Sequence, residues 1–292
     1  MTLYLRDKLF VTTTMKDQFQ IIHQSAKEER DYVLEYQNID VNLRPKINLS
    51  GVEIDNISRD RAVAIIIDWV KKKEKFHHVL FLDPIKLMEM REGKSLNRIP
   101  KKSSMVLAEA GGMDWAAECT GEKLEETISI ISLMMDIIRF SEKQSLTLFF
   151  LGSKEKVIER LFFNLIKHFP EIRIVGRHSG YLTKERELMV KEAIRKTGPD
   201  IIFLGMDFPD QELWIENNTG YFGKSVVIGT WRTFDILSGN LDKVPDFFQR
   251  KELHWLWKII TKPWRLKKVW IAIRFYFHFR WKRMKSKQQA SP

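Results

Sequence analysis

The stretch from residue 201 to residue 239 restricts the fold more than any other part of the chain. It reads IIFLGMDFPDQELWIENNTGYFGKSVVIGTWRTFDILSG. Two short apolar runs, 201–204 and 225–228, are separated by a turn and by a helical pattern over 211–217. Two buried strands joined by a helix form a βαβ unit, which requires a parallel sheet with a right-handed crossover. This stretch therefore predicts an α/β domain.

A loop with glycine and polar residues follows each of these two strands. In open α/β sheets, ligands bind beyond the carboxyl ends of the strands. Gly205 and Gly229 allow a ligand to approach the backbone closely. The polar side chains that could contact such a ligand are Asp207, Asp210, Gln211, Thr230, Arg232, Thr233 and Asp235. We interpret the two loops as one wall of a binding cleft.

Further strands and helices alternate over residues 78–230. Strands are predicted at 78–82, 105–107, 146–151 and 172–175. Helices are predicted at 86–91, 115–117, 124–140, 154–169 and 185–196. Residues 47–54 alternate like a strand or a hairpin, and Ser58 is suited to cap the helix that follows. The expected fold is a Rossmann-like, doubly wound α/β domain with a mainly parallel sheet.

Composition narrows the class of protein. The chain has 292 residues, of which 44% are hydrophobic and 30% charged, so it is not expected to be disordered. The single cysteine, Cys119, excludes an internal disulfide framework and fits a reducing compartment. The seven histidines show no spacing typical of a metal site. A secretory signal is not expected, because the start of the chain has no long apolar core after a basic cap. A transmembrane helix is not expected either, because no apolar run reaches 18 residues.

The net charge of +11 is confined to the C-terminal tail. Residues 253–292 contain eleven Lys or Arg and no Asp or Glu, whereas residues 1–252 contain 38 basic and 38 acidic residues. Five of the nine Trp also lie in this tail. A helix that mixes Trp and Phe with Lys and Arg can lie in the membrane interface and bind anionic lipid. Alternatively, the aromatic residues pack on the domain and the charges are solvated.

A nucleic-acid partner is the third interpretation of the tail, since Lys, Arg and Trp also suit single strands. It does not explain the neutral body with its predicted cleft, so no nucleic acid is expected. The chain is therefore divided into a variable extension (1–45), an α/β core (46–240) and a helical, basic and aromatic appendage (241–292).

Several segments resemble, in the same order, the WecG/TagA/CpsF glycosyltransferases of family 26. They are INLSGVEIDN from residue 47, FLDP from 81, LFFLGS from 148, RIVGRHSGY from 173, PDIIFLGMDFPDQELWI from 199, IGTWRTFDILSG from 228 and VPDFFQRKELHWLW from 244. The resemblance covers roughly residues 47–280. Its strongest parts are the loops that follow the two strands of the βαβ unit and the segment that leads into the tail.

The resemblance implies a transferase that moves an N-acetylhexosamine from a UDP-sugar to a polyprenyl-diphosphate-linked acceptor. The donor is typically UDP-N-acetylmannosamine or its uronate, and the transfer inverts the anomeric centre without a metal or other cofactor. Such enzymes work at the inner, cytoplasmic face of the bacterial membrane, to which a C-terminal appendage docks them. The corresponding docking residues here are Arg265, Lys267, Lys268, Trp270 and Arg274. Family members can form oligomers, so a homo-oligomer is also an expectation.

The resemblance also assigns the reacting groups. An inverting transfer needs a carboxylate to accept the proton of the acceptor hydroxyl. The proposed base of the family is an Asp in a Pro-Asp-Gly turn, and Glu109 takes that position here. The predicted substrate-binding residues are Asp83, Gly205, Asp207, Gln211, Thr230, Arg232, Thr233 and Asp235.

Three positions depart from the family pattern. Glu109 replaces the Asp, Asp83 replaces the Asn of a Thr-Pro-Asn-Pro segment, and Glu118 replaces an Arg. These changes leave two interpretations open. The protein is an active transferase with an altered substrate preference and Glu109 as base, or it is a weakened relative that binds a sugar nucleotide or partner enzymes without efficient turnover.

Overall fold

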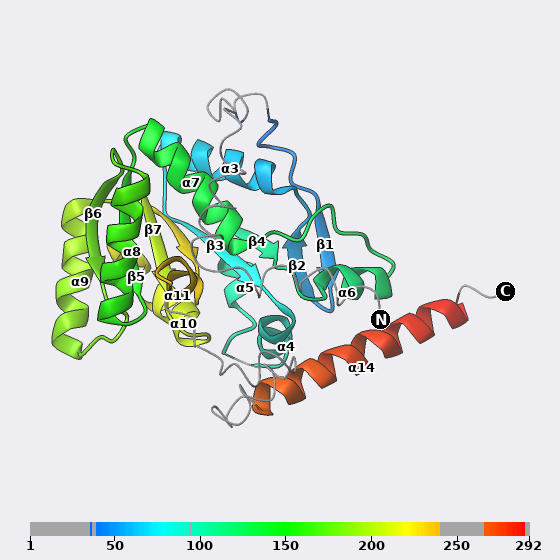
Figure 1. Cartoon of the computed structure of the whole chain (residues 1–292). Coiled ribbons are helices and arrows are strands. Elements are labelled where there is room, and N and C mark those ends of the chain that lie inside the picture. The colour runs from blue at the N-terminus through cyan, green and yellow to red at the C-terminus, as the bar shows by residue number, and fades with distance from the viewer. Residues whose placement is uncertain (1–35, 37–38, 94, 240–265, 290–292) are drawn as a thin grey trace, which may run out of the picture.

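The computed structural model describes residues 36, 39–93, 95–239 and 266–289, and it has the expected α/β architecture. Six parallel strands form one sheet in the order β4-β3-β8-β7-β5-β6 (Figure 1). The strands are β3 (His77–Leu82), β4 (Met105–Ala108), β5 (Thr147–Gly152), β6 (Arg173–His178), β7 (Ile201–Gly205) and β8 (Val226–Gly229). The prediction of a parallel sheet in which the two strands of the βαβ unit pair is confirmed.

Helices cover both faces of this sheet. One face packs against α3 (Arg59–Lys72), α7 (Ile130–Lys143), α8 (Glu155–His168) and α11 (Thr233–Leu237). The other face packs against α4 (Pro84–Glu92), α5 (Ile99–Lys102), α6 (Met113–Cys119), α9 (Lys184–Thr197) and α10 (Asp210–Asn217). A short 3₁₀ helix, Thr219–Tyr221, precedes β8. The fold is therefore doubly wound, as the alternation of strands and helices predicts.

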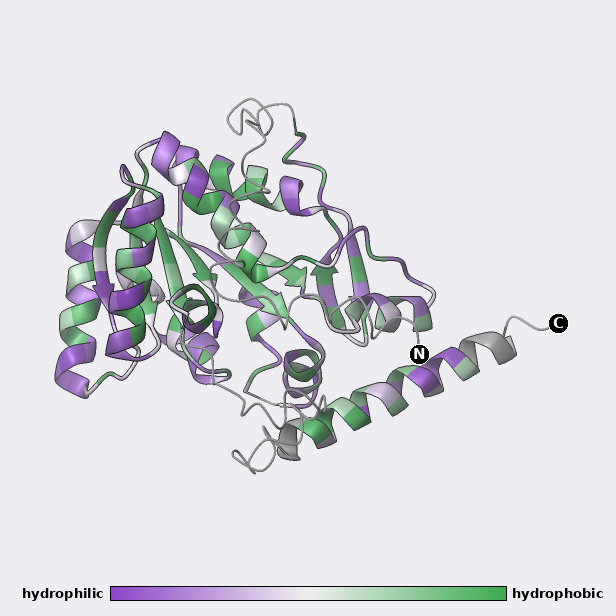
Figure 2. Cartoon of the chain, viewed as in Figure 1, coloured by the Kyte–Doolittle hydropathy of each residue, from purple (hydrophilic) through white to green (hydrophobic). Residues whose placement is uncertain are grey.

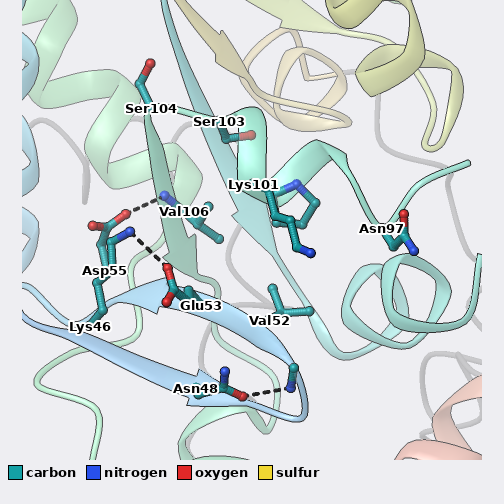
Figure 3. Close-up of a pocket in the computed structure, with 12 residues that line it drawn as sticks. Lys46, Asn48, Val52, Glu53, Asp55, Asn97, Lys101, Ser103, Ser104 and Val106 are labelled. Atoms are coloured by element: carbon teal, nitrogen blue, oxygen red, sulfur yellow. Dashed lines mark hydrogen bonds and ion pairs between the residues drawn. The ribbon is translucent and has the colours of Figure 1, made fainter.

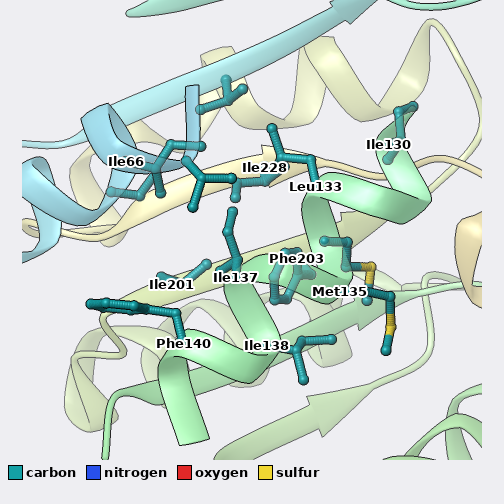
Figure 4. Close-up of a cluster of buried hydrophobic side chains, with 14 of the residues drawn as sticks. Ile66, Ile130, Leu133, Met135, Ile137, Ile138, Phe140, Ile201, Phe203 and Ile228 are labelled. Atoms are coloured by element: carbon teal, nitrogen blue, oxygen red, sulfur yellow. The ribbon is translucent and has the colours of Figure 1, made fainter. Parts of the chain in front are cut away.

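The strands are continuous apolar runs because both of their faces are buried. In β7, Ile201 and Phe203 belong to the core under α3 and α7, whereas Ile202 and Leu204 belong to the core under α9 and α10. Figure 4 shows the first of these cores, in which side chains of α7 meet Ile201, Phe203 and Ile228 of the sheet. The loops at the carboxyl ends of the strands thus start from a rigid support.

A hairpin of β1 (Lys46–Leu49) and β2 (Val52–Asp55) covers the β4 end of the sheet. Its two turn residues, Ser50 and Gly51, both have positive φ, which suits a two-residue hairpin turn. One carboxylate oxygen of Asp55 accepts a hydrogen bond from Val106 N at 2.7 Å. The hairpin therefore fixes the position of β4.

The prediction of a helix over 124–140 is wrong at its start, since α7 begins only at Ile130. The backbone N–H of Ile128 donates to the carbonyl of Ala108, and that of Glu125 donates to the side chain of Asn56. These hydrogen bonds tie the segment to the end of β4 instead of to a helix. Ser129 then caps α7.

The long helix α14 (Leu266–Gln289) is the described part of the appendage, and it lies across α4 and α6. One side of α14 is buried in the core through Ile271, Phe275 and Phe279. The Tyr276 ring stacks on Trp115 of α6 with 5.2 Å between centroids. Figure 2 shows hydrophobic residues along its first half and hydrophilic ones further on.

The N-terminal extension contributes one described residue to the body before position 39. Tyr36 is buried and meets the Phe140 ring edge-on, with 6.5 Å between centroids. Residues 1–35 and 240–265 lie outside the described part of the chain, and with them Arg265 and three of the five Trp of the tail.

Candidate active site

The topology places a switch point at the carboxyl ends of β3 and β8. These two strands are neighbours in the sheet. The chain leaves β3 for α4 on one face and leaves β8 for α11 on the opposite face. Such a switch between adjacent strands is where open α/β sheets bind ligands. The predicted site residues all lie on the loops or helix starts at this end of the sheet.

The buried side chain of Gln211 connects the β7 and β8 loops by hydrogen bonds to both. Its side-chain oxygen accepts hydrogen bonds from Met206 N at 3.3 Å and Trp231 N at 3.2 Å, and its nitrogen donates to Glu212 at 2.8 Å. Only 1% of Gln211 is exposed. A Cβ at Gly229 would lie 2.3 Å from this nitrogen. The structure thus gives Gln211 the role of shaping the two loops.

Three further predicted residues also belong to the buried frame. Thr230 donates its hydroxyl to the carbonyl of Leu204 at 2.8 Å, and Thr233 donates its N–H to the carbonyl of Thr230. Gly205 makes room for the Phe234 ring, which a Cβ would meet at 2.6 Å. These residues hold the loops at the strand ends and are covered by protein.

The more accessible side chains of this wall are Asp207, Asp210, Arg232 and Asp235. The Trp231 indole donates to Asp207 at 3.3 Å, and the Ser153 hydroxyl donates to Asp235 at 3.4 Å. Trp231 has φ +44°, which is uncommon for a bulky residue. The loop after β8 is therefore held in a specific, strained conformation by its neighbours, as is common at binding sites.

Glu109 and Asp83 lie side by side at the ends of β4 and β3. Leu82 and Ala108 are paired in register, and Glu109 N donates to the carbonyl of Leu82 at 2.9 Å. Asp83 caps α4 by accepting from Lys86 N at 2.8 Å. Glu109 precedes a turn in which Gly111 and Gly112 have positive φ. The two carboxylates that the sequence singled out are brought together.

The environment of Glu109 suits proton transfer near neutral pH. Its pKa is raised to about 7, chiefly by burial, while the Lys86 charge lowers the pKa and the Asp83 charge raises it. One carboxylate oxygen, Oε2, is buried and has no hydrogen-bond partner among the described residues. An acid or base is most effective when its pKa lies near the working pH. Glu109 is thus equipped to accept a proton from a bound hydroxyl.

A buried group of charged side chains behind Glu109 is not predicted from the sequence. Glu212 contacts His78 at 3.1 Å, and the other ring nitrogen of His78 lies 3.1 Å from the Ser103 hydroxyl. Burial favours the neutral form of Glu212, but the hydrogen bond and charge of His78, with Lys86 and Gln211, hold its pKa below the ordinary value. Lys86 itself is only 2% exposed. In the sequence, the one sign of this buried group is Lys86 itself, which lies between apolar residues in the segment FLDPIKLM.

Glu118, the third departure from the family pattern, is exposed on α6. Its neighbour Cys119 is buried, and burial raises the pKa of that thiol. Glu118 therefore does not share the enclosed surroundings of Glu109.

The appendage lies next to the Glu109 loop. A Cβ at Gly112 would lie 3.9 Å from the Phe275 ring of α14. Arg274 forms an ion pair with Glu92, at the end of α4, at 2.8 Å. The two helices on which α14 rests start directly after Asp83 and Gly112. Helix α14 thus supports both sides of the Glu109–Asp83 pair.

A separate hollow of about 400 Å³ lies at the opposite end of β4 (Figure 3). It is lined by the hairpin, by α5 and by the residues that lead into β4. Its charged side chains include Lys46 and Glu53, which pair with each other at 3.2 Å. This hollow is therefore distinct from the carboxylate pair.

The described residues offer neither a metal site nor a membrane span. No three His, Cys, Asp or Glu side chains there are grouped so that they could hold a metal ion. Among the same residues, no helix combines the length and the hydropathy that a bilayer span requires.

Comparison with known proteins identifies the family. The model of the glycosyl transferase WecG/TagA/CpsF family matches residues 47–289. The chain belongs to this family. The match includes both loops of the cleft, the Glu109 turn and α14, so the predicted resemblance is confirmed over the whole described core.

Curated relatives carry a specific name. A protein of Bacillus subtilis (strain 168) is 29% identical over 167 residues, which is 57% of this chain and 64% of the relative. A protein of Staphylococcus aureus (strain NCTC 8325 / PS 47) is 24% identical over 216 residues, which is 74% of this chain and 84% of the relative. Both are named N-acetylglucosaminyldiphosphoundecaprenol N-acetyl-beta-D-mannosaminyltransferase. The aligned part thus spans just under two thirds of the Bacillus subtilis relative.

Proposed function

We propose that this WecG/TagA/CpsF family member is an active inverting glycosyltransferase. It transfers an N-acetylhexosamine of the N-acetylmannosamine type from a UDP-sugar to a polyprenyl-diphosphate-linked saccharide, in the synthesis of a cell-envelope polysaccharide. The names of its relatives support the sugar and the acceptor. The observation that carries the proposal is the half-buried Glu109 carboxyl, whose pKa is about 7 at the ligand-binding end of the sheet.

In this reaction Glu109 is the general base. It accepts the proton of the acceptor hydroxyl as that oxygen attacks the anomeric carbon and the bond from this carbon to the UDP oxygen breaks. The product is the inverted glycoside, with UDP as leaving group and protonated Glu109. The carboxylate of Glu lies one methylene further from the backbone than that of Asp, and a misplacement of about 1 Å can cost on the order of 100-fold in rate. The burial and charges around Glu109 support its use as base in place of Asp.

The loops after β7 and β8 receive the UDP-sugar. Their accessible side chains, Asp207, Asp210, Arg232 and Asp235, are the candidates for direct contact. The buried frame of Gly205, Gln211, Thr230 and Thr233 fixes the loop backbone to which the donor binds. Asp83 and Glu109 face the acceptor. This division gives the predicted site residues two kinds of role, contact and positioning.

Helix α14 docks the enzyme on the inner face of the bacterial membrane. The side of α14 that faces away from the body exposes Trp270, Ile273, Phe277, Trp281 and Met284. These residues recur every three or four positions, so they share one face of the helix. Basic residues including Arg280 and Arg283 lie on the same helix. Apolar side chains with flanking Lys and Arg suit an interface that contains anionic lipid.

The docking residues predicted from the sequence differ in their surroundings. Trp270 is 61% exposed and lies on the outer face. Arg274 is partly engaged by Glu92. Lys267 and Lys268 lie in the first turn of α14, whereas Arg265 lies outside the described residues. Trp270 is therefore the residue of this set that supports docking most directly.

The proposal is tested by measuring the release of UDP and the anomeric form of the product. Purified protein with anionic vesicles receives UDP-N-acetylmannosamine, its uronate or UDP-N-acetylglucosamine, together with a polyprenyl-diphosphate-N-acetylglucosamine acceptor. The expected result is acceptor-dependent release of UDP with an N-acetylmannosamine-type donor and an inverted product. Binding of UDP without turnover of any donor would instead indicate a weakened relative that does not catalyse efficient transfer.

A further inference from the structure

Lys86 is a buried cation with no adjacent counterion among the described residues. It lies in the first turn of α4, and its ammonium donates to the carbonyl of Phe81 at 3.1 Å. No carboxylate oxygen of a described residue lies within ion-pair distance of this ammonium. An ammonium has three N–H groups, and a charge removed from water is costly unless other charges compensate for it. A residue that only packs α4 against the sheet would not need this charge.

Lys86 shares the end of β3 with two carboxylates. Its ammonium donates to the Phe81 carbonyl, Glu109 N donates to the carbonyl of the next residue, Leu82, and Asp83 accepts from Lys86 N at 2.8 Å. A third carboxylate, Glu212, is paired with His78. The Lys86 charge acts on both Glu109 and Glu212. Among the described residues, the charges that act on Glu109 are those of Lys86 from α4 and Asp83 from the loop before it.

The carboxylate of Glu212 already has two polar partners. Glu212 accepts from the Gln211 side chain at 2.8 Å and contacts His78 at 3.1 Å. By contrast, Oε2 of Glu109 is buried without a hydrogen-bond partner among the described residues. Among the described residues, no hydrogen bond or ion pair therefore joins Lys86 to Glu109. The electrostatic attraction between the two side chains depends on whether Glu109 carries a proton.

We propose that Lys86 is a positioning residue for Glu109, supplying the buried positive charge that stabilises the Glu109 carboxylate, while Asp83 supplies an opposing negative charge. The inference rests on the proposed function, in which Glu109 is the base. Burial and the Asp83 charge alone would keep Glu109 protonated and inactive at neutral pH. Lys86 supplies the compensating charge and remains an ammonium throughout, since the proton moves only from the acceptor oxygen to Glu109.

The pH dependence of kcat/KM tests this proposal, because it reports the ionisation of the free enzyme. In the wild type, the acid limb is expected to have its midpoint near pH 7, since the pKa of Glu109 is about 7. Lys86→Met is expected to move the midpoint up by about one unit or more, and Asp83→Asn is expected to move it down. Asn caps a helix as well as Asp, so Asp83→Asn preserves the start of α4.

Opposite shifts from two residues on the same turn separate a charge effect from structural damage. Damage to α4 would lower the rate at every pH without moving the midpoint in opposite directions. Lys102→Met is the matched control, because Lys102 is exposed and paired with Glu216. The midpoint of the kcat/KM profile should not move in this variant. Equal midpoints in the wild type, Lys86→Met and Asp83→Asn would overturn the proposal. If Lys86→Met does not fold, Lys86→Gln replaces it.

A second measurement does not depend on turnover. Glutamate labelled with ¹³C at the carboxyl carbon is titrated by NMR, and the Glu109 signal is the one absent in Glu109→Gln. A signal that titrates higher in Lys86→Met and lower in Asp83→Asn supports the role of Lys86. An unchanged signal in Lys86→Met overturns this role even if Glu109 is the base. A shifted signal with an unshifted rate profile shows instead that Glu109 is not the base, and the proposed function fails with the inference.

Discussion

At the scale of single residues, the shape of the candidate site depends on buried side chains. The clearest example is Gln211, whose three hydrogen bonds set the spacing of the β7 and β8 loops. From the sequence, Gln211 is predicted to bind substrate because it matches a motif glutamine of the family. Whether such a residue contacts a ligand or supports those that do depends on burial, which a motif does not encode.

We predict that Gly229→Ala disturbs this arrangement. The new Cβ would lie 2.3 Å from the Gln211 side-chain nitrogen and 3.3 Å from Glu212, so Gln211 must move and release the loop amides. The expected loss is about 1–3 kcal/mol in the free energy of unfolding, together with weaker UDP binding. Urea unfolding and calorimetric titration with UDP measure the two effects.

The control for this variant is Gly220→Ala, because a Cβ at Gly220 meets nothing within 4 Å. Its free energy of unfolding should change by less than about 0.5 kcal/mol. If both variants bind UDP as the wild type does, Gln211 does not shape the donor site.

His77 provides a pH-dependent prediction that is independent of the site. Burial, together with the charges of Lys75 and Arg44, lowers its pKa from 6.5 to about 4, and its ring stacks on Trp69 at 4.1 Å. As pH falls from about 6.5 to about 4, the unfolded chain binds a proton that the folded protein does not. The free energy of unfolding should therefore fall in this window.

The variant His77→Phe isolates this effect. Phenylalanine keeps a ring for stacking and removes a buried nitrogen, Nδ1, that has no hydrogen-bond partner among the described residues. Unfolding in urea at pH 7, 5.5 and 4.5 should show a smaller decline in the variant than in the wild type. Parallel declines would mean that His77 is protonated in the folded protein.

At the scale of elements, the sequence predicts what periodicity and turn residues control. The buried runs of β3, β5 and β7 and the hairpin at 47–54 are found where expected. The early start of the 124–140 helix was wrong because residues 124–129 have helical composition but bond to Asn56 and Ala108, which are distant in sequence. Such long-range partners are not visible in a local pattern.

Helix α14 has two apolar sides with different roles, and variants on the two sides separate them. Phe275 is 5% exposed and packs against Trp115, whereas Phe277 is 64% exposed. Phe275→Ala should lower the free energy of unfolding by about 3–5 kcal/mol. Phe277→Ala should leave unfolding nearly unchanged and weaken binding to anionic vesicles roughly tenfold, the effect of removing about 1.5 kcal/mol of apolar burial.

Sedimentation with vesicles that contain phosphatidylglycerol measures the binding of both variants, and thermal unfolding measures their stability. Full vesicle binding by Phe277→Ala at wild-type stability would show that the outer side of α14 does not dock on lipid. Substituting a position on the body with similar exposure, Phe163→Ala on α8, controls for the general loss of an exposed ring.

At the scale of the whole molecule, the fold places two groups of site residues at the carboxyl ends of the parallel strands. The β7 and β8 loops form a wall supported by buried Gln211 and Thr230, and the β3 and β4 ends form a wall with the Glu109–Asp83 pair. The fold and the family could be predicted from the sequence because buried strands and ordered motifs carry that information. The buried group of His78, Lys86 and Glu212 could not, because its members come from three separate elements.

We propose that Glu109 removes the proton of the acceptor in glycosyl transfer. The most direct test is the single-turnover rate of transfer at pH 7.5 for the wild type, Glu109→Gln and the exposed control Glu118→Gln. We predict a loss of at least about 100-fold in Glu109→Gln with UDP binding retained, the usual range for a general base, and little change in Glu118→Gln. An unchanged transfer rate in Glu109→Gln would show that Glu109 is not the base.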